Sequence, residues 1–137
     1  MIYEERKYRS GTASGRYTYF RVIHEETDLW IGVPSGSGIP ELITRIEQSV
    51  ASLRKRLDSF INQHPEFLRS LEPLAYPGDV PPPVKMLLEA STIAGTGPMA
   101  GIAGLFALES GRCLLQSGCV EVVIENGGDI FASTLEG

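Results

Sequence analysis

The chain has 137 residues, 42% of them hydrophobic, and a net charge of −5, which suits one folded domain over residues 1–137. The negative charge argues against nucleic-acid binding, because Lys and Arg hold the phosphate backbone; the basic clusters at residues 6–9 and 54–56 are interpreted as solvated faces. No apolar run reaches membrane-spanning length and the N-terminus lacks the order of a secretory signal, so we expect a cytoplasmic protein that does not bind membranes.

The first quarter of the chain is predicted to be β-structure. Residues 2–9 alternate weakly and are charged, as in an edge strand. Residues 16–26 alternate more cleanly, the pair Thr27-Asp28 interrupts the pattern, and residues 29–33 resume it. These segments predict a three-stranded antiparallel meander.

A long helix is predicted to begin at Pro40, because proline and the following acid Glu41 both suit a first helical turn. Its apolar residues recur at three-then-four spacing, which favours a helix packed on the sheet over a short coiled coil. These positions are Ile43, Ile46, Val50, Leu53, Leu57 and Phe60. His64-Pro65 ends the helix, and residues 66–71 predict a further short helical turn.

The remaining elements alternate between helix and strand. Residues 72–83 are proline-rich and predict an irregular connector, after which residues 84–94 predict a helix. A helix rich in Gly and Ala is predicted from Pro98 to about Gln116, and its small residues suggest burial on two sides. Strands are predicted at residues 119–125 and 130–134. The fold class is therefore α+β, with antiparallel sheet, a long packed helix and a buried Gly/Ala-rich helix.

The bend before Pro98 is the first candidate binding site. Gly95 and Gly97 permit unusual backbone conformations, and unpaired N–H groups of Gly95, Thr96 and Gly97 at a helix start would attract a phosphate. The spacing up to Ala100 also fits a dinucleotide-binding loop, but such a loop follows a strand, and a helix is predicted here. A plain helix-to-helix turn, with glycines for close packing, remains an equal alternative.

The bend after Glu125 is the second candidate. Asn126, Gly127 and Gly128 predict a tight hairpin turn, which by itself needs no chemistry. Oxygen atoms of Glu125, Asn126 and Asp129 gather around it, and Mg²⁺ prefers such ligands together with phosphate. We therefore expect Asn126, Gly127, Gly128 and Asp129 to bind a cofactor, with Asp129 as the metal ligand, and we expect the two bends to meet in one polar hollow.

The histidines and cysteines are interpreted as structural. His24 lies in an alternating strand and His64 at a helix end, and neither has a nucleophile motif beside it. Cys113 and Cys119 are expected to be reduced core thiols, since a cytoplasmic chain with two cysteines rarely forms a disulfide.

Several motifs resemble an uncharacterised bacterial and archaeal family related to ApbE, the flavin transferases that move FMN from FAD onto a protein Thr or Ser. They are GPMAGIAG at residues 97–104, ENGGDI at 125–130, YEER at 3–6, ETDLW at 26–30 and HPEFLRSLEP at 64–73. The resemblance implies an ApbE-like α+β fold, a flavin nucleotide (FAD or FMN) and Mg²⁺. It also implies that Gly127, Gly128 and Asp129 contribute to the flavin pocket.

The resemblance leaves the activity open. The transferases carry a Lys-Gly step where this chain has Ile102-Ala103-Gly104, and they take further metal ligands from a later segment, so we expect a C-terminal portion to be missing after Gly137. Unpaired strands would then favour a homo-oligomer. The leading hypothesis is binding of a flavin nucleotide or a similar phosphorylated ligand. The alternative is a non-catalytic structural or assembly domain, whose glycine loops serve packing only.

Overall fold

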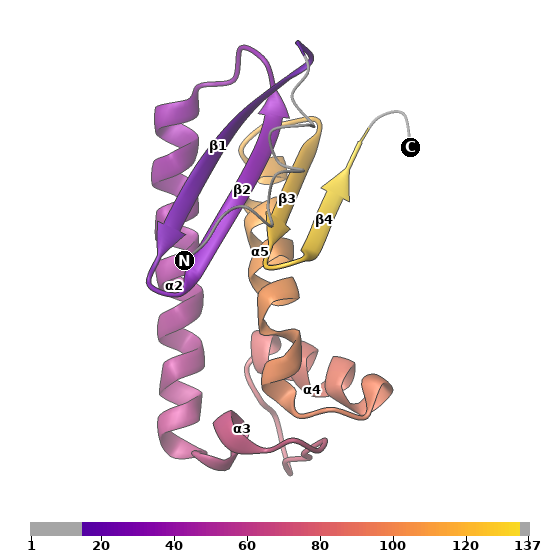
Figure 1. The fold of residues 1–137 in the computed structure, drawn as a ribbon. Coiled ribbons are helices and arrows are strands. Elements are labelled where there is room, and N and C mark those ends of the chain that lie inside the picture. Colours follow the sequence, from indigo (N-terminus) through magenta and orange to yellow (C-terminus); the bar gives the residue numbers. More distant parts are fainter. Residues whose placement is uncertain (1–14, 135–137) are drawn as a thin grey trace.

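The computed structural model describes residues 15–134. A four-stranded antiparallel sheet runs in the order β1 (Tyr17–His24), β2 (Thr27–Pro34), β3 (Val122–Asn126), β4 (Asp129–Ser133). Helices α2 (Ile39–Gln63) and α5 (Ile102–Gln116) cover one face of the sheet (Figure 1). The predicted α+β class is confirmed, whereas the edge strand expected at residues 2–9 lies outside the described residues.

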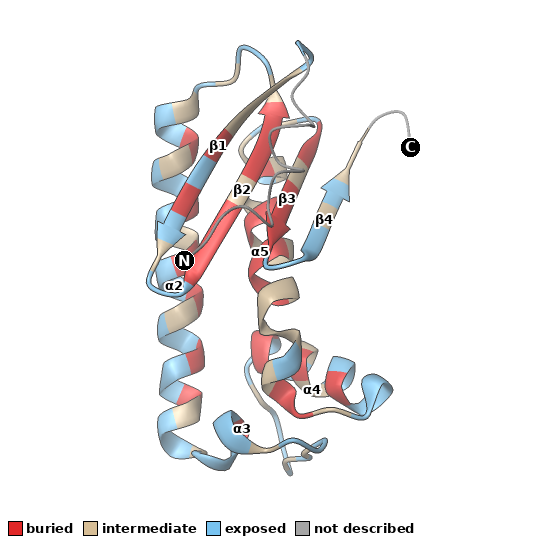
Figure 2. Cartoon of the chain, viewed as in Figure 1, coloured by how far each residue is buried: buried red, intermediate tan, exposed pale blue. Residues whose placement is uncertain are grey.

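The hydrophobic core lies between the sheet and these two helices (Figure 2). Alternate strand residues point into it, because side chains on a strand alternate between the two faces. They are Phe20, Val22, Leu29, Ile31, Val33, Val122 and Ile124. The other side of the core comes from α2, whose buried residues are Leu42, Ile46, Val50, Leu53, Leu57 and Phe60. The predicted helix stripe is confirmed, except that Leu42 is buried and Ile43 only half-buried.

The break predicted at Thr27-Asp28 is wrong. The chain reverses at Glu25 and Glu26 instead, and Glu25 takes a positive φ of 52°. Thr27 and Asp28 belong to β2 and are both buried. Asp28 is accommodated because Arg21 on β1 donates two hydrogen bonds to its carboxylate, at 2.8 and 3.0 Å. Asp28, whose carboxylate led to the predicted break, is thus paired with Arg21 on the neighbouring strand.

The end of α2 leads into the second helical layer. The backbone N–H of His64 donates to the carbonyls of Phe60 and Ile61, and α3 (Glu66–Arg69) follows as a single turn. Helix α4 (Pro82–Ala94) starts two residues before the predicted helix, since a proline in the first turn leaves no N–H unpaired. Residues 70–81 form the irregular connector between them.

The Gly/Ala-rich helix is two elements. Pro98–Gly101 form the 3₁₀ helix η2, and α5 begins at Ile102. Helix α5 packs against α2 on one side and against β3 and β4 on the other, so the predicted burial on two sides is confirmed. At Gly111 an added Cβ would overlap the Phe131 ring, and the missing side chain therefore lets β4 approach the helix.

The last two strands differ slightly from prediction. Strand β3 begins at Val122, because the N–H of Cys119 donates to Leu114 at the end of α5 and Val120 is 58% exposed. Gly127 and Gly128 form a two-residue turn with φ of 60° and 100°, which suits the twist of an antiparallel hairpin. Asp129 is therefore the first residue of β4.

Within residues 15–134 no single helix is both long and apolar enough to cross a membrane. Helix α4 and the segment Pro98–Gln116 reach such a length only as a pair, and their axes are bent by 105°.

Candidate functional site

The β3–β4 turn is held rigidly against α5. The side-chain amide of Asn126 donates to the Ala103 carbonyl at 3.1 Å. Glu125 accepts a hydrogen bond from the N–H of Gly128 at 2.9 Å. Both side chains are buried, with exposures of 8% for Asn126 and 5% for Glu125. These two residues therefore have a structural role: they fix the shape of the turn that presents Asp129.

Asp129 itself faces solvent. Among the described residues its carboxylate makes no hydrogen bond or ion pair, and it lies beside Gly104 on α5. A Cβ placed on Gly104 would lie 3.7 Å from an Asp129 carboxylate oxygen. No side chain therefore stands between α5 and the carboxylate at Gly104, and Asp129 is exposed to solvent.

The bend at residues 95–97 is built differently. Gly95 has a φ of 72° and caps α4, and the N–H groups of Gly95 and Thr96 both donate to the Ser91 carbonyl, at 2.8 and 3.1 Å. Gly97 is buried, and a Cβ there would overlap the backbone oxygen of Ser70. In this conformation the glycines serve helix capping and close packing, and two of the three N–H groups are already engaged.

The two bends do not form one hollow. The β3–β4 turn contacts α5 at Ala103 and Gly104, whereas the bend at residues 95–97 packs against the connector at Ser70. Figure 1 shows the loop between α4 and α5 at the far end of the molecule from the sheet, while the β3–β4 turn lies beside α5. The predicted site residues therefore form two separate groups, residues 95–97 and residues 126–129.

Metal binding at Asp129 would depend on a single carboxylate. No group of three or more His, Cys, Asp or Glu side chains converges in the part of the chain that the structure describes. Mg²⁺ commonly takes one or two carboxylates and fills its other positions with water and ligand phosphate. Asp129 suits that mode and does not suit a cage made only of protein ligands.

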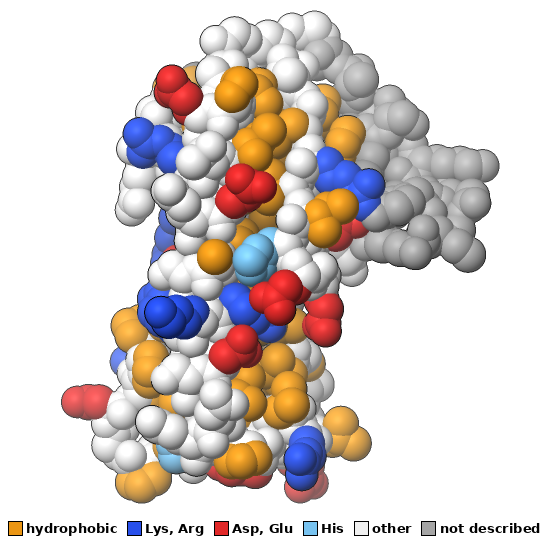
Figure 3. Space-filling model, turned by 90° about the vertical axis from the view of Figure 1, so that its left-hand side faces the viewer, with side chains coloured by type: hydrophobic (Ala, Val, Ile, Leu, Met, Phe, Trp, Pro, Cys, Tyr) orange, Lys and Arg blue, Asp and Glu red, His pale blue; other side chains and the backbone are white. Residues whose placement is uncertain are grey.

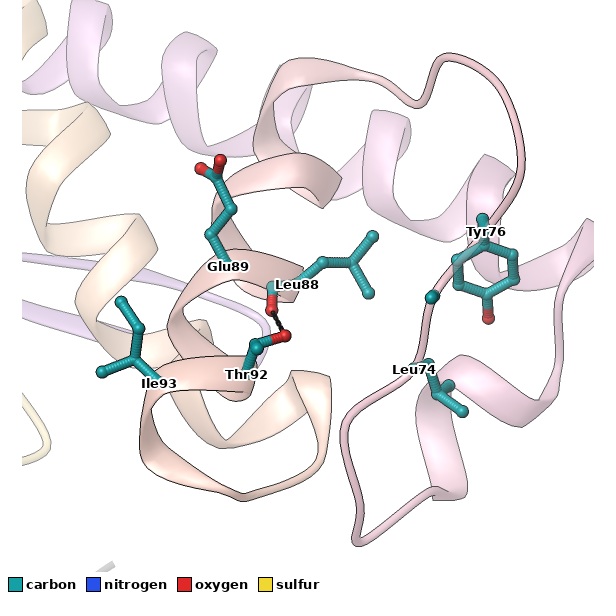
Figure 4. Close-up of a pocket in the computed structure, with 7 residues that line it drawn as sticks. Leu74, Tyr76, Leu88, Glu89, Thr92 and Ile93 are labelled. Atoms are coloured by element: carbon teal, nitrogen blue, oxygen red, sulfur yellow. Dashed lines mark hydrogen bonds between the residues drawn. The ribbon is translucent and has the colours of Figure 1, made fainter.

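Sequence reasoning missed an apolar pocket of about 610 Å³ beside α4 (Figure 4). Leu88 on α4 points toward Tyr76 on the connector, Thr92 and Leu74 complete this side of the lining, and Ile93 points away from the connector. The Thr92 hydroxyl donates to the Leu88 carbonyl at 2.9 Å, and the Tyr76 hydroxyl donates to Glu66 at 2.6 Å. Apolar residues within a proline-rich stretch were the available signal, but only the fold shows that they face a helix.

Several other titratable groups make structural contacts. Burial and the hydrogen bond to Glu66 raise the pKa of Tyr76 to about 12, and the same bond lowers the pKa of Glu66. His64 stacks on Phe60 with ring centroids 4.4 Å apart, as expected for a helix-end residue. Cys113 and Cys119 are both free, and burial raises the pKa of the Cys119 thiol.

Comparison with known proteins places the chain among related sequences. The family model described as "AbpE bacteria" matches residues 9–137. A UPF0280 protein of Methanococcus maripaludis strain C5 is 34% identical over 106 residues, which cover 77% of this chain and 41% of that relative. A UPF0280 protein of Methanococcus aeolicus is 34% identical over 92 residues, 67% of this chain and 37% of the relative.

A UPF0280 protein of Methanococcoides burtonii is 34% identical over 84 residues, which cover 61% of this chain and 35% of the relative. The chain thus spans about two fifths of the length of the curated relatives it matches. The expected resemblance to an uncharacterised family is confirmed. With a match over nearly all of its residues, the chain belongs to the family described as AbpE bacteria.

Proposed function

We propose that this chain contributes to binding a flavin nucleotide, FAD or FMN, or a similar phosphorylated ligand, as its likeness to the ApbE transferases suggests. The observation that carries the proposal is the Asp129 carboxylate, which is exposed and unpaired among the described residues. It stands on a turn whose shape two buried side chains fix, so little conformational freedom is lost when a ligand binds.

Asp129 would accept hydrogen bonds from ligand hydroxyls or bind Mg²⁺ that is shared with a ligand phosphate. When bound, the metal would neutralise phosphate charge beside the carboxylate. Gly127 and Gly128 support this placement, because a Cβ at either position would meet no atom within 4 Å and the backbone is open to a ligand. Binding of phosphate by Gly95 and Thr96 would require their N–H groups to leave the Ser91 carbonyl.

The activity of the whole protein is a separate proposal, since the chain spans 41% of the relative from strain C5. We propose FMN transfer only for a protein that supplies the remaining groups. The described residues would hold and orient the nucleotide.

A fluorescence titration of FAD and FMN, with and without Mg²⁺, tests the binding proposal. We expect quenching of flavin fluorescence and a stronger effect with Mg²⁺. Asp129→Asn should weaken binding by about tenfold or more, since a hydrogen bond to a charged group contributes about 1.5–3 kcal/mol. Asp79→Asn is the matched control, because Asp79 is also an exposed carboxylate but lies on the connector.

Two results would contradict the proposal: no quenching by the wild-type chain, or equal affinity of wild type and Asp129→Asn. A circular dichroism spectrum of each variant shows that the fold is unchanged.

A structural or assembly domain is the second candidate function. The observation in its favour is that the N–H groups of Gly95 and Thr96 already cap α4 and that the missing side chain of Gly97 lets the bend pack against Ser70. This candidate predicts no flavin binding and a stable complex with a partner chain. The same titration, followed by sedimentation analysis of the chain, separates the two candidates.

A further inference from the structure

A second hollow, of about 390 Å³, lies between the β1–β2 turn and the middle of α2. Figure 3 shows basic and acidic side chains gathered around a histidine on this face of the molecule. The charged and amide side chains that line it, together with a histidine, are His24 and Glu25 from the hairpin, and Arg54, Lys55, Asp58 and Asn62 from α2. The hollow shares no lining residue with the β3–β4 turn.

Arg54 is the central group. Its guanidinium carbon lies 4.7 Å from the centre of the Phe106 ring on α5, and its Nη2 lies 3.5 Å from the Thr27 hydroxyl. The ring and the hydroxyl hold the planar group in place without neutralising it. The basic residues 54–56 were interpreted as a solvated face, but Arg54 is half-buried.

The charge of Arg54 has no carboxylate partner within residues 15–134. Its Nε is buried and makes no hydrogen bond there. Asp58 is one helical turn away and yet forms no ion pair with it. A half-buried guanidinium that lines a hollow and has no carboxylate partner among these residues suits an anion such as phosphate.

The rest of the lining narrows the class of ligand. Lys55 adds a second positive charge beside Arg54, whereas Glu25 and Asp58 supply carboxylates. His24 Nε2 lies 3.2 Å from a Glu25 carboxylate oxygen, which leaves Asp58 and the Asn62 amide as the available acceptors. Carboxylates would repel a bare anion but accept hydrogen bonds from hydroxyl groups.

We propose that this hollow binds a small phosphate monoester that also carries hydroxyl groups. The phosphate pairs with Arg54 and Lys55, and the hydroxyls donate to Asp58 and Asn62. The site is independent of Asp129 and of flavin binding.

The probe is glycerol 3-phosphate, titrated into the full chain and followed by amide chemical shifts in ¹H–¹⁵N NMR spectra. We expect saturable shifts at the β1–β2 turn and at α2. Inorganic phosphate should bind more weakly and glycerol should not bind. Arg54→Gln should weaken binding by about tenfold and Lys55→Gln by a few-fold, because a charge-assisted hydrogen bond is lost in each.

Arg56→Gln is the matched control, because Arg56 is exposed on the same helix and does not line the hollow. Asp129→Asn serves as a second control and should bind the probe normally. The proposal is overturned if Arg56→Gln weakens binding as much as Arg54→Gln, or if the wild-type chain shows no saturable shifts. Should Arg54→Gln fail to fold, unchanged binding by Lys55→Gln and Asp58→Asn would overturn it equally.

Discussion

Single glycines of α5 test how the helix contacts the sheet. Replacing Gly by Ala in a helix interior raises the free energy of unfolding by about 1 kcal/mol. At Gly104 the added Cβ would be in ordinary contact, so Gly104→Ala should raise the free energy of unfolding by about 0.5–1 kcal/mol. At Gly111 the added Cβ would overlap the Phe131 ring. Gly111→Ala should therefore lower the free energy of unfolding by about 1–2 kcal/mol, because overpacking costs more than the improved helix propensity contributes.

Urea denaturation followed by circular dichroism measures both variants, and Gly104→Ala is the control for helix propensity. If both substitutions stabilise the protein equally, Phe131 does not pack on Gly111. In a Phe131→Ala variant, Gly111→Ala should no longer lower the free energy of unfolding in this way. Removing the Phe131 ring makes room for the new Cβ at residue 111.

At the scale of elements, Tyr76 joins the connector to α2 and α3. Its ring packs edge-on against Phe60 with centroids 5.3 Å apart, and its hydroxyl donates to Glu66 at 2.6 Å. Tyr76→Phe keeps the ring but removes this bond. We expect it to lower the free energy of unfolding at pH 7 by about 1 kcal/mol, the usual net contribution of one hydrogen bond.

The effect of Tyr76→Phe should depend on pH. Burial and the hydrogen bond to Glu66 raise the pKa of Tyr76 from the ordinary tyrosine value of 10.0 to about 12, so the folded state holds the proton more tightly. The stability that Tyr76 contributes is complete below pH 10 and is lost as the pH rises toward 12. Wild type and variant should therefore converge between these values, and a constant difference in denaturation midpoint across that range would contradict the assignment.

Elements whose apolar residues all fall on one face were predictable from sequence. Elements that contain a buried polar residue paired with a distant partner were not. The stripe of α2 predicts its buried face because each apolar residue returns to one side of the helix. Asp28 predicted a break, since a carboxylate disfavours a buried strand unless a partner is present. That partner, Arg21, lies across the hairpin and is identified only when the register is known.

At the scale of the whole molecule, the sequence predicted where both candidate bends occur along the chain but not how far apart they lie in the fold. Gly95 and Gly97 were expected at a bend, and they are there. Whether their N–H groups face a ligand or cap α4 depends on where α4 ends relative to Ser91, and small residues permit either. The hollow at Arg54 could not be predicted from sequence either. Phe106 and Thr27 are distant from Arg54 along the chain and contact its side chain only in the folded structure.

The outer edge of the sheet bears on assembly. Within the described residues β4 pairs only with β3, and Ile130 on β4 is 66% exposed. An open strand edge with an apolar side chain favours pairing with another chain. We expect the chain to self-associate as its concentration rises. Ile130→Lys should weaken self-association by about tenfold, since burial of an Ile side chain contributes about 1.5–3 kcal/mol.

Sedimentation velocity over a range of concentrations measures this effect. Val120→Lys is the control, because Val120 is 58% exposed but precedes β3 and lies on no strand edge. A charge at residue 120 should leave self-association almost unchanged. If both lysine variants shift the equilibrium equally, net charge and not the β4 edge governs association. A monomer at all concentrations would remove the edge as an interface between copies of this chain.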